Sequence, residues 1–124
     1  MDPVSDFLIT IKNGYMAKKD QVVVPHSKFK MAIARVLEEE NFIKKAEKKD
    51  RSINIELLYQ NGKPRISTVK RVSKPGLRFY AKSKSIKIPR GGRGLTIVST
   101  PQGVMAGRLA KEKKLGGEVI CQIW

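Results

Sequence analysis

The sequence predicts an α+β protein of two small packed domains: an N-terminal α/β domain over residues 1–65 and a mostly β domain with one short helix over residues 66–124. Three observations predict this class. Apolar residues recur at helical spacing in the first forty residues, they alternate from residue 53 onward, and turn signals separate the later segments. The chain has 124 residues, 40% of them hydrophobic, which is enough for a core, so we expect a folded chain rather than a disordered one.

A helix is expected at the start of the chain. Asp2 is a good N-cap residue, and Pro3 suits the first helical position because no N–H is needed there. The apolar residues that follow are spaced by four, three and four, which predicts one buried stripe made of Val4, Leu8, Ile11 and Tyr15. The β-branched run from Val22 to Val24 then predicts a short strand.

A second helix is expected after Ser27, which is a suitable N-cap residue. Its apolar face is predicted to hold Phe29, Ile33, Val36 and Leu37. Asn41 can adopt the left-handed conformation that ends a helix.

The rest of the chain is expected to be mainly strands. Alternation predicts a strand from Ile53 to Tyr59, and Asn61-Gly62 predicts a hairpin whose return strand is residues 65–72. A turn over residues 73–76 and a strand over residues 77–82 follow.

Two further strands are expected over residues 95–99 and 119–123. Between them, Thr100-Pro101 repeats the cap-then-proline signature, which predicts a helix from about residue 101 to residue 113, broken by Gly116-Gly117.

Charge is the strongest functional signal in the sequence. Lys and Arg number 26 against 11 Asp and Glu, for a net charge of +15. The excess is concentrated in residues 66–124, which hold 13 basic and 2 acidic residues. A solvated surface normally mixes both signs, so this exclusion indicates a surface that faces phosphates.

No catalytic or metal-binding pattern is found, and we expect no enzyme, no metal and no cofactor. The single His26 is expected in a surface loop and the single Cys121 in the core. Gly91 to Gly94 lacks the lysine and hydroxyl of a phosphate-binding loop. No apolar run is long enough to cross a membrane and no signal peptide is recognised, so we expect the cytoplasm, or an organelle interior if a leader has been removed.

Alternation along residues 77–82 places Arg78, Tyr80 and Lys82 on one face. An aromatic ring between two cations suits base stacking with phosphate contact; alternatively, Tyr80 covers a small apolar patch. The basic surface is expected to continue through phosphate-contacting side chains, namely Lys84, Lys87, Arg90 and Arg93.

A cluster of hydrogen-bond donors is expected over Ser99 to Gly103, with strand-end hydroxyls beside the N–H groups of the helix start. Such a cluster can bind a phosphate, a 2′-hydroxyl or a base edge, although Thr100 also suits plain helix capping. Gly116 and Gly117 permit a close backbone approach or simply turn the chain. Glu118 either accepts hydrogen bonds from a base amino group or is an ordinary exposed strand-end residue.

Three segments of the chain resemble a known family. Ser99 to Met105, followed by Gly116 to Cys121, resembles the C-terminal signature of bacterial-type small-subunit ribosomal protein eight. Asp2 to Leu8 resembles the opening helix of that family, and Ser73 to Arg78 resembles its central turn. The likeness runs in register over nearly the whole chain.

The resemblance implies a structural protein that binds a central-domain stem of small-subunit ribosomal RNA at a distorted internal loop, beside neighbouring ribosomal proteins. Its main RNA site would be formed by Ser99, Thr100, Gly116, Gly117 and Glu118, with Tyr80 nearby. Gly103, at the end of the donor cluster described above, is a further RNA-binding candidate. A second RNA helix would meet the N-terminal domain, where Lys28 and Lys30 are candidates. Some family members also repress translation of their own operon mRNA.

Two segments depart from the family pattern. Pro101 stands where the family commonly has a second serine, and residues 83–94 are unusually basic and rich in glycine. The competing hypotheses are a translational repressor that uses the same surface and a generic DNA-binding protein. The sequence shows no helix-turn-helix and no zinc finger to support the latter.

Overall fold

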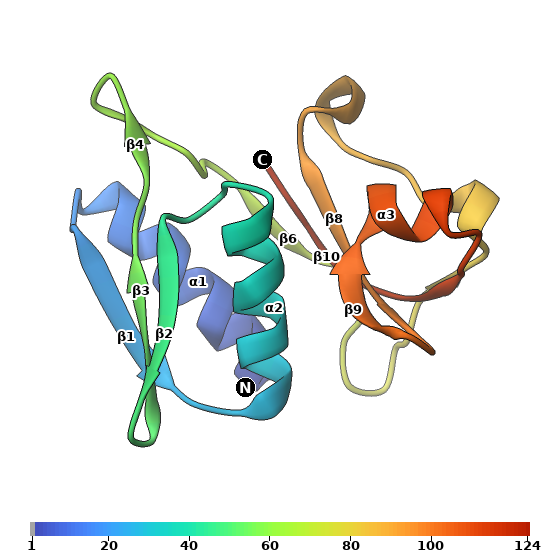
Figure 1. Ribbon diagram of the computed structural model, residues 1–124, viewed down its shortest axis with the longest axis horizontal. Helices are drawn as coiled ribbons and strands as arrows, with labels where there is room; N and C mark the ends of the chain where they lie inside the picture. The colour runs from blue at the N-terminus through green and yellow to red at the C-terminus, as the bar shows by residue number, and fades with distance from the viewer. Residues whose placement is uncertain (1) are drawn as a thin grey trace. The chain divides into compact units, whose positions relative to one another are not determined.

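The computed structural model describes residues 2–124, which form two compact units: unit 1 runs to Ser67, and unit 2 runs from Thr68 to Trp124 (Figure 1). The elements of unit 1 are α1 (Pro3–Met16), β1 (Gln21–Pro25), α2 (Lys28–Glu39), β2 (Lys45–Lys49), β3 (Ser52–Glu56), β4 (Tyr59–Gln60) and β5 (Lys63–Pro64). The elements of unit 2 are β6 (Val69–Arg71), β7 (Tyr80–Ala81), η1 (Ser83–Ser85), η2 (Arg90–Gly92), β8 (Leu95–Thr100), β9 (Gly103–Ala106), α3 (Gly107–Glu112) and β10 (Gly117–Ile123). The mixture of helices and strands confirms the predicted α+β class.

Unit 1 is an antiparallel sheet in the order β1-β3-β2, with both long helices on one face (Figure 1). The predicted start of α1 is confirmed, because the Asp2 carboxylate accepts a hydrogen bond from the Val4 N–H at 3.2 Å. The predicted end of α2 is also confirmed, since Asn41 has a φ of 61°. Alternate strand residues point under the helices, so a buried core forms from Phe7, Leu8, Ile11, Ile33, Leu37, Ile53 and Ile55.

Tyr15 ties the core of unit 1 to the chain that follows α2 and β3. Its ring is buried, and its hydroxyl donates to the Phe42 carbonyl at 2.8 Å and accepts from the Leu58 N–H at 3.0 Å. Burial raises the pKa of Tyr15 above its usual value of 10.0, because the phenolate would lose its hydration.

The face predicted for the second helix is wrong at its first turn. Phe29 is 38% exposed, whereas Lys30, one residue later, is 8% exposed. The helix that begins after Ser27 therefore directs Lys30 toward the core, on the same face as Ile33 and Leu37. The long apolar stem of the lysine side chain can be buried there.

Unit 2 is an antiparallel sheet in the order β6-β10-β8-β9, and β7 pairs with the first part of β10. The core of this unit contains Val98 and Met105 from the sheet, Ala110 from α3 and Ile86, which follows η1. β10 is the longest strand and pairs with three others, so it organises the whole unit.

The helix predicted for residues 101–113 is mostly wrong. The chain instead turns tightly after Thr100, pairs β9 with β8, and becomes helical only from Gly107 to Glu112. Strand pairing is favoured over a longer helix because it places Met105 opposite Val98, inside the core. The burial of these residues outweighs the local helix signals.

Two predicted strands are also shorter or paired differently. The Asn61-Gly62 hairpin is present, but its return strand is β5, and β6 belongs to unit 2, where it pairs with β10. Of residues 77–82, only Tyr80 and Ala81 are strand, because the preceding residues form a tight loop.

Candidate nucleic-acid interface

Three side chains predicted to bind a ligand lie in one row across the sheet of unit 2. Glu118 on β10 is directly opposite Tyr80 on β7 and directly opposite Ser99 on β8. Directly opposed residues of antiparallel strands share a face, with Cβ atoms about 5 Å apart. We call Tyr80, Glu118 and Ser99 the polar row; it presents a ring, a carboxylate and a hydroxyl within about 10 Å.

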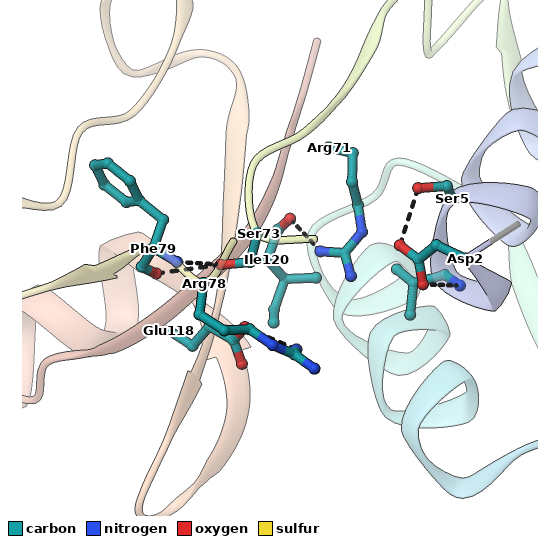
Figure 2. A network of polar contacts seen from close by, with 9 residues as sticks. Asp2, Ser5, Arg71, Ser73, Arg78, Phe79, Glu118 and Ile120 are labelled. Carbon is teal, nitrogen blue, oxygen red and sulfur yellow. Dashed lines mark hydrogen bonds and ion pairs between the residues drawn. The ribbon is translucent and has the colours of Figure 1, made fainter. Parts of the chain in front are cut away.

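The loop before β7 is held by a buried serine. Ser73 is fully buried, and its hydroxyl accepts from the Phe79 N–H at 2.9 Å and donates to the Phe79 carbonyl at 3.2 Å (Figure 2). Inside this loop, Lys74 and Leu77 exchange backbone hydrogen bonds around Pro75-Gly76, which confirms the predicted turn. The serine therefore fixes the backbone of Phe79 itself.

Arg78 and Glu118 contact each other. The Arg78 guanidinium donates to the Glu118 carboxylate at 3.1 Å (Figure 2). The exposed fractions of the two side chains are 52% and 17%. Sequence reasoning had placed both among independent ligand contacts, but the structure makes them one ion-paired unit with the carboxylate held in place.

The two glycines before Glu118 allow the strands to pack closely. A Cβ on Gly117 would overlap the Ser99 carbonyl oxygen, and a Cβ on Gly116 would lie 2.7 Å from the Ala81 carbonyl oxygen. No side chain is tolerated at such distances without a backbone shift. Close packing of β7, β8 and β10 is therefore required for the polar row to form.

The two hydroxyls at the end of β8 differ in availability. Thr100 is 8% exposed, and its hydroxyl donates to the Gly103 carbonyl at 2.8 Å and accepts from the Gln102 N–H at 3.1 Å. Its proton is thus used inside the β8–β9 turn, not in capping a helix. The Ser99 hydroxyl has no hydrogen-bond partner within residues 2–124, so it is the one available to a ligand.

A hollow of 590 Å³ lies next to the polar row. Its lining consists of Tyr80, Ala81, Lys82, Ser83, Lys114, Gly116 and Gly117. Lys82 was predicted as a contact, whereas Ser83 and Lys114 were missed. Lys114 could have been predicted from the sequence, because it lies two residues before Gly116, which was already a candidate site residue.

The other predicted cations lie elsewhere. Lys84 is exposed in η1, beside Ser83 of the hollow, while Lys87 lines a different cavity. The Arg90 guanidinium lies 5.6 Å from the centre of the Trp124 ring. In unit 1, Lys28 is exposed, but Lys30 lines a cavity of 230 Å³ together with Asp6.

Burial raises the pKa of Cys121 to about 12, so its thiol stays protonated, and it lies in the core as predicted. The described residues contain no group of three or more His, Cys, Asp or Glu side chains able to hold a metal ion. They also include no helix long and apolar enough to span a bilayer.

Comparison with known proteins gives consistent matches over the full length. Residues 2–124 match the family model described as ribosomal protein S8. The chain is 45% identical over 123 residues to the small ribosomal subunit protein uS8 of Nitratidesulfovibrio vulgaris, covering 99% of this chain and 98% of that protein. It is 47% identical over 128 residues to the uS8 protein of Roseiflexus castenholzii, covering 99% and 97%.

Proposed function

The chain belongs to the ribosomal protein S8 family and is therefore a structural constituent of the small ribosomal subunit, and we propose that it binds a central-domain stem of small-subunit ribosomal RNA through the polar row. Ribosomal RNA and other ribosomal proteins are its partners, and it resides in the cytoplasmic ribosome. The family is non-enzymatic, which agrees with the sequence-based expectation.

The observation that carries the proposal is the alignment of Tyr80, Glu118 and Ser99 on one sheet face. The exposed Tyr80 ring can stack on an unpaired base, and the carboxylate of Glu118 can accept from a base amino group. The Ser99 hydroxyl can bond a 2′-hydroxyl or a base edge. An internal loop provides an unpaired base with accessible edges, whereas a regular duplex does not.

Electrostatics supports the same surface. The row lies in the half of the sequence with 13 basic and 2 acidic residues, and Lys82 and Lys114 line the adjoining hollow. These cations can hold phosphates, which position an RNA without reading its sequence. The same site would also serve a stem in the protein's own operon mRNA, and that regulatory role is a second candidate. A reporter fused to the operon leader tests it, and unchanged expression on overproduction of the protein excludes it.

The proposed function is tested by titrating the protein with three ligands at several salt concentrations. These are a central-domain stem with its internal loop, the same stem with the loop replaced by paired bases, and duplex DNA of equal length. We expect the first to bind most tightly and to keep its advantage as salt rises. Equal affinities that fall together with salt would reduce the protein to a polyanion binder.

A further inference from the structure

Unit 2 contains a second hollow, of 380 Å³, whose lining shares only Ala81 with the hollow beside the polar row. Its lining comes from β6 and β7, which both pair with β10, from β10 itself and from the segment after η1. The family resemblance assigns no role to this cavity. Its volume is within the range of sites that hold small organic groups, about 300–1,000 Å³.

The floor of the cavity is apolar. Ile86 and Val119 are buried beneath it, and the Phe79 ring borders it although 57% of Phe79 is exposed. The backbone of Phe79 is fixed on both sides, by the Ser73 hydroxyl and by the Val119 N–H, which donates to its carbonyl at 2.9 Å. Figure 2 shows its ring directed away from the Arg78–Glu118 pair. A large exposed ring on a fixed backbone can serve as a stacking platform.

One amide can read polar edges inside the cavity. The Gln122 side chain donates to the Lys87 carbonyl at 3.3 Å, and the same carbonyl also accepts from the Thr96 hydroxyl. This bond orients the amide, and its oxygen and second N–H have no partner within the described residues. A fixed amide with one acceptor and one donor free matches the edge of a nucleobase.

The rim of the cavity is cationic. Lys70 and Lys87 are exposed there, and no lining residue is acidic. The apolar floor favours a flat uncharged group, and the cationic rim favours a ligand in which that group carries an anion. A nucleotide combines the two, with its base over Phe79 and its phosphate between the lysines.

We propose that this cavity is a second nucleotide subsite, which takes one unstacked nucleotide of the RNA held by the polar row. The proposal rests on the RNA-binding function argued above. Phe79 and Tyr80 are consecutive and project to opposite sides, and the two hollows meet at Ala81. An RNA strand that crosses β7 can therefore occupy both.

The test uses nuclear magnetic resonance of the full chain labelled with nitrogen-15, titrated with adenosine monophosphate, uridine monophosphate and ribose 5-phosphate. We expect both nucleotides to shift the Gln122 side-chain amide and the Val119 backbone signal saturably. Ribose 5-phosphate, which has no base, should leave the Gln122 signal in place. Phe79→Ala should weaken nucleotide binding by at least about fivefold, and Lys87→Gln by about two- to fivefold.

The matched control is Leu77→Ala, because Leu77 is 70% exposed in the same loop and does not line the cavity. It should bind nucleotides as the parent does. The cognate stem, extended by three unpaired nucleotides, should then shift the Gln122 and Ser99 signals together, and Phe79→Ala should remove only the former.

Three outcomes would overturn the subsite. If the stem shifts Ser99 and Glu118 but no nucleotide or extension shifts Gln122, the subsite is wrong and the RNA-binding function stands. If the stem shifts none of these signals, the proposed function fails and the subsite fails with it. If nucleotides are inert but the acidic peptide Asp-Phe-Asp shifts Gln122 saturably, the cavity accepts a protein segment instead.

Discussion

The guanidinium of Arg78 donates a hydrogen bond to the carboxylate of Glu118 at 3.1 Å, next to the position where β7 pairs with β10. The Glu118 side chain is 17% exposed and lies between Tyr80 and Ser99 in the polar row. Arg78 thus holds the one acidic group of the row in a fixed direction while neutralising part of its repulsion toward phosphates.

This pairing predicts that Arg78→Ala and Glu118→Ala will not be additive. Each should weaken binding to the cognate stem by about 1–3 kcal/mol, because each disturbs the same carboxylate contact. The double variant should bind little worse than Glu118→Ala alone. A double-mutant cycle measured by equilibrium titration gives the coupling.

Lys74→Ala is the control, since Lys74 is an exposed cation in the same loop. This substitution should weaken binding to the stem and binding to duplex DNA to the same small extent. If Arg78→Ala behaves identically, Arg78 is only a phosphate contact and the positioning role is wrong.

Ser99 and Thr100 should separate binding from stability. Ser99→Ala removes a hydroxyl without a partner in the described chain, so stem binding should fall by about 1–3 kcal/mol with the free energy of unfolding unchanged. Thr100→Val removes two hydrogen bonds of the β8–β9 turn, so the free energy of unfolding should fall by about 1 kcal/mol. Urea unfolding and stem titration of both variants check this, and equal binding by Ser99→Ala and the parent would remove Ser99 from the site.

Gly117→Ala should destabilise the protein by about 1–3 kcal/mol or more, because its methyl group overlaps the Ser99 carbonyl and forces β8 and β10 apart. Stem binding should fall as well, since the row spans both strands. The control is Gly62→Asn in the β4–β5 turn, where φ is 78° and a Cβ meets no atom within 4 Å. Its stability should stay close to that of the parent. Thermal unfolding of both variants measures the difference.

Stability should fall at alkaline pH in a way that depends on Cys121. Burial raises the pKa of Cys121 from 9.0 to about 12, so between these values the unfolded chain has lost the thiol proton that the folded chain keeps. The contribution of Cys121 is therefore fully present below pH 9 and falls by up to about 1.4 kcal/mol per pH unit above it. The raised pKa of Tyr15 adds a further loss above pH 10.

Urea unfolding between pH 8 and pH 10.5 measures this slope. Cys121→Ala will be less stable throughout, because it leaves a cavity in the core, but its stability should decline less steeply. Parallel slopes for the parent and the variant would contradict the shift.

Local signals were reliable where one residue decides the backbone. The Asp2 cap, the left-handed Asn41 and the Asn61-Gly62 turn were all predicted, because each depends on side-chain chemistry within a few residues. The same kind of signal misled at Thr100-Pro101. There the cap-then-proline pattern was outweighed by the pairing of β9 with β8, which no local pattern encodes.

For the site, the sequence by itself determined the residue types and the excess of positive charge, because composition and motif are properties of the chain. It named Tyr80, Ser99 and Glu118 as candidates, and the family resemblance placed them around one RNA site. Only the tertiary structure decided that they form one row, that Arg78 is bound to Glu118, and that the proton of Thr100 is used internally. The reason is physical: these relationships depend on strand pairing between segments about 20 and 40 residues apart, and pairing is set by burial of the whole core.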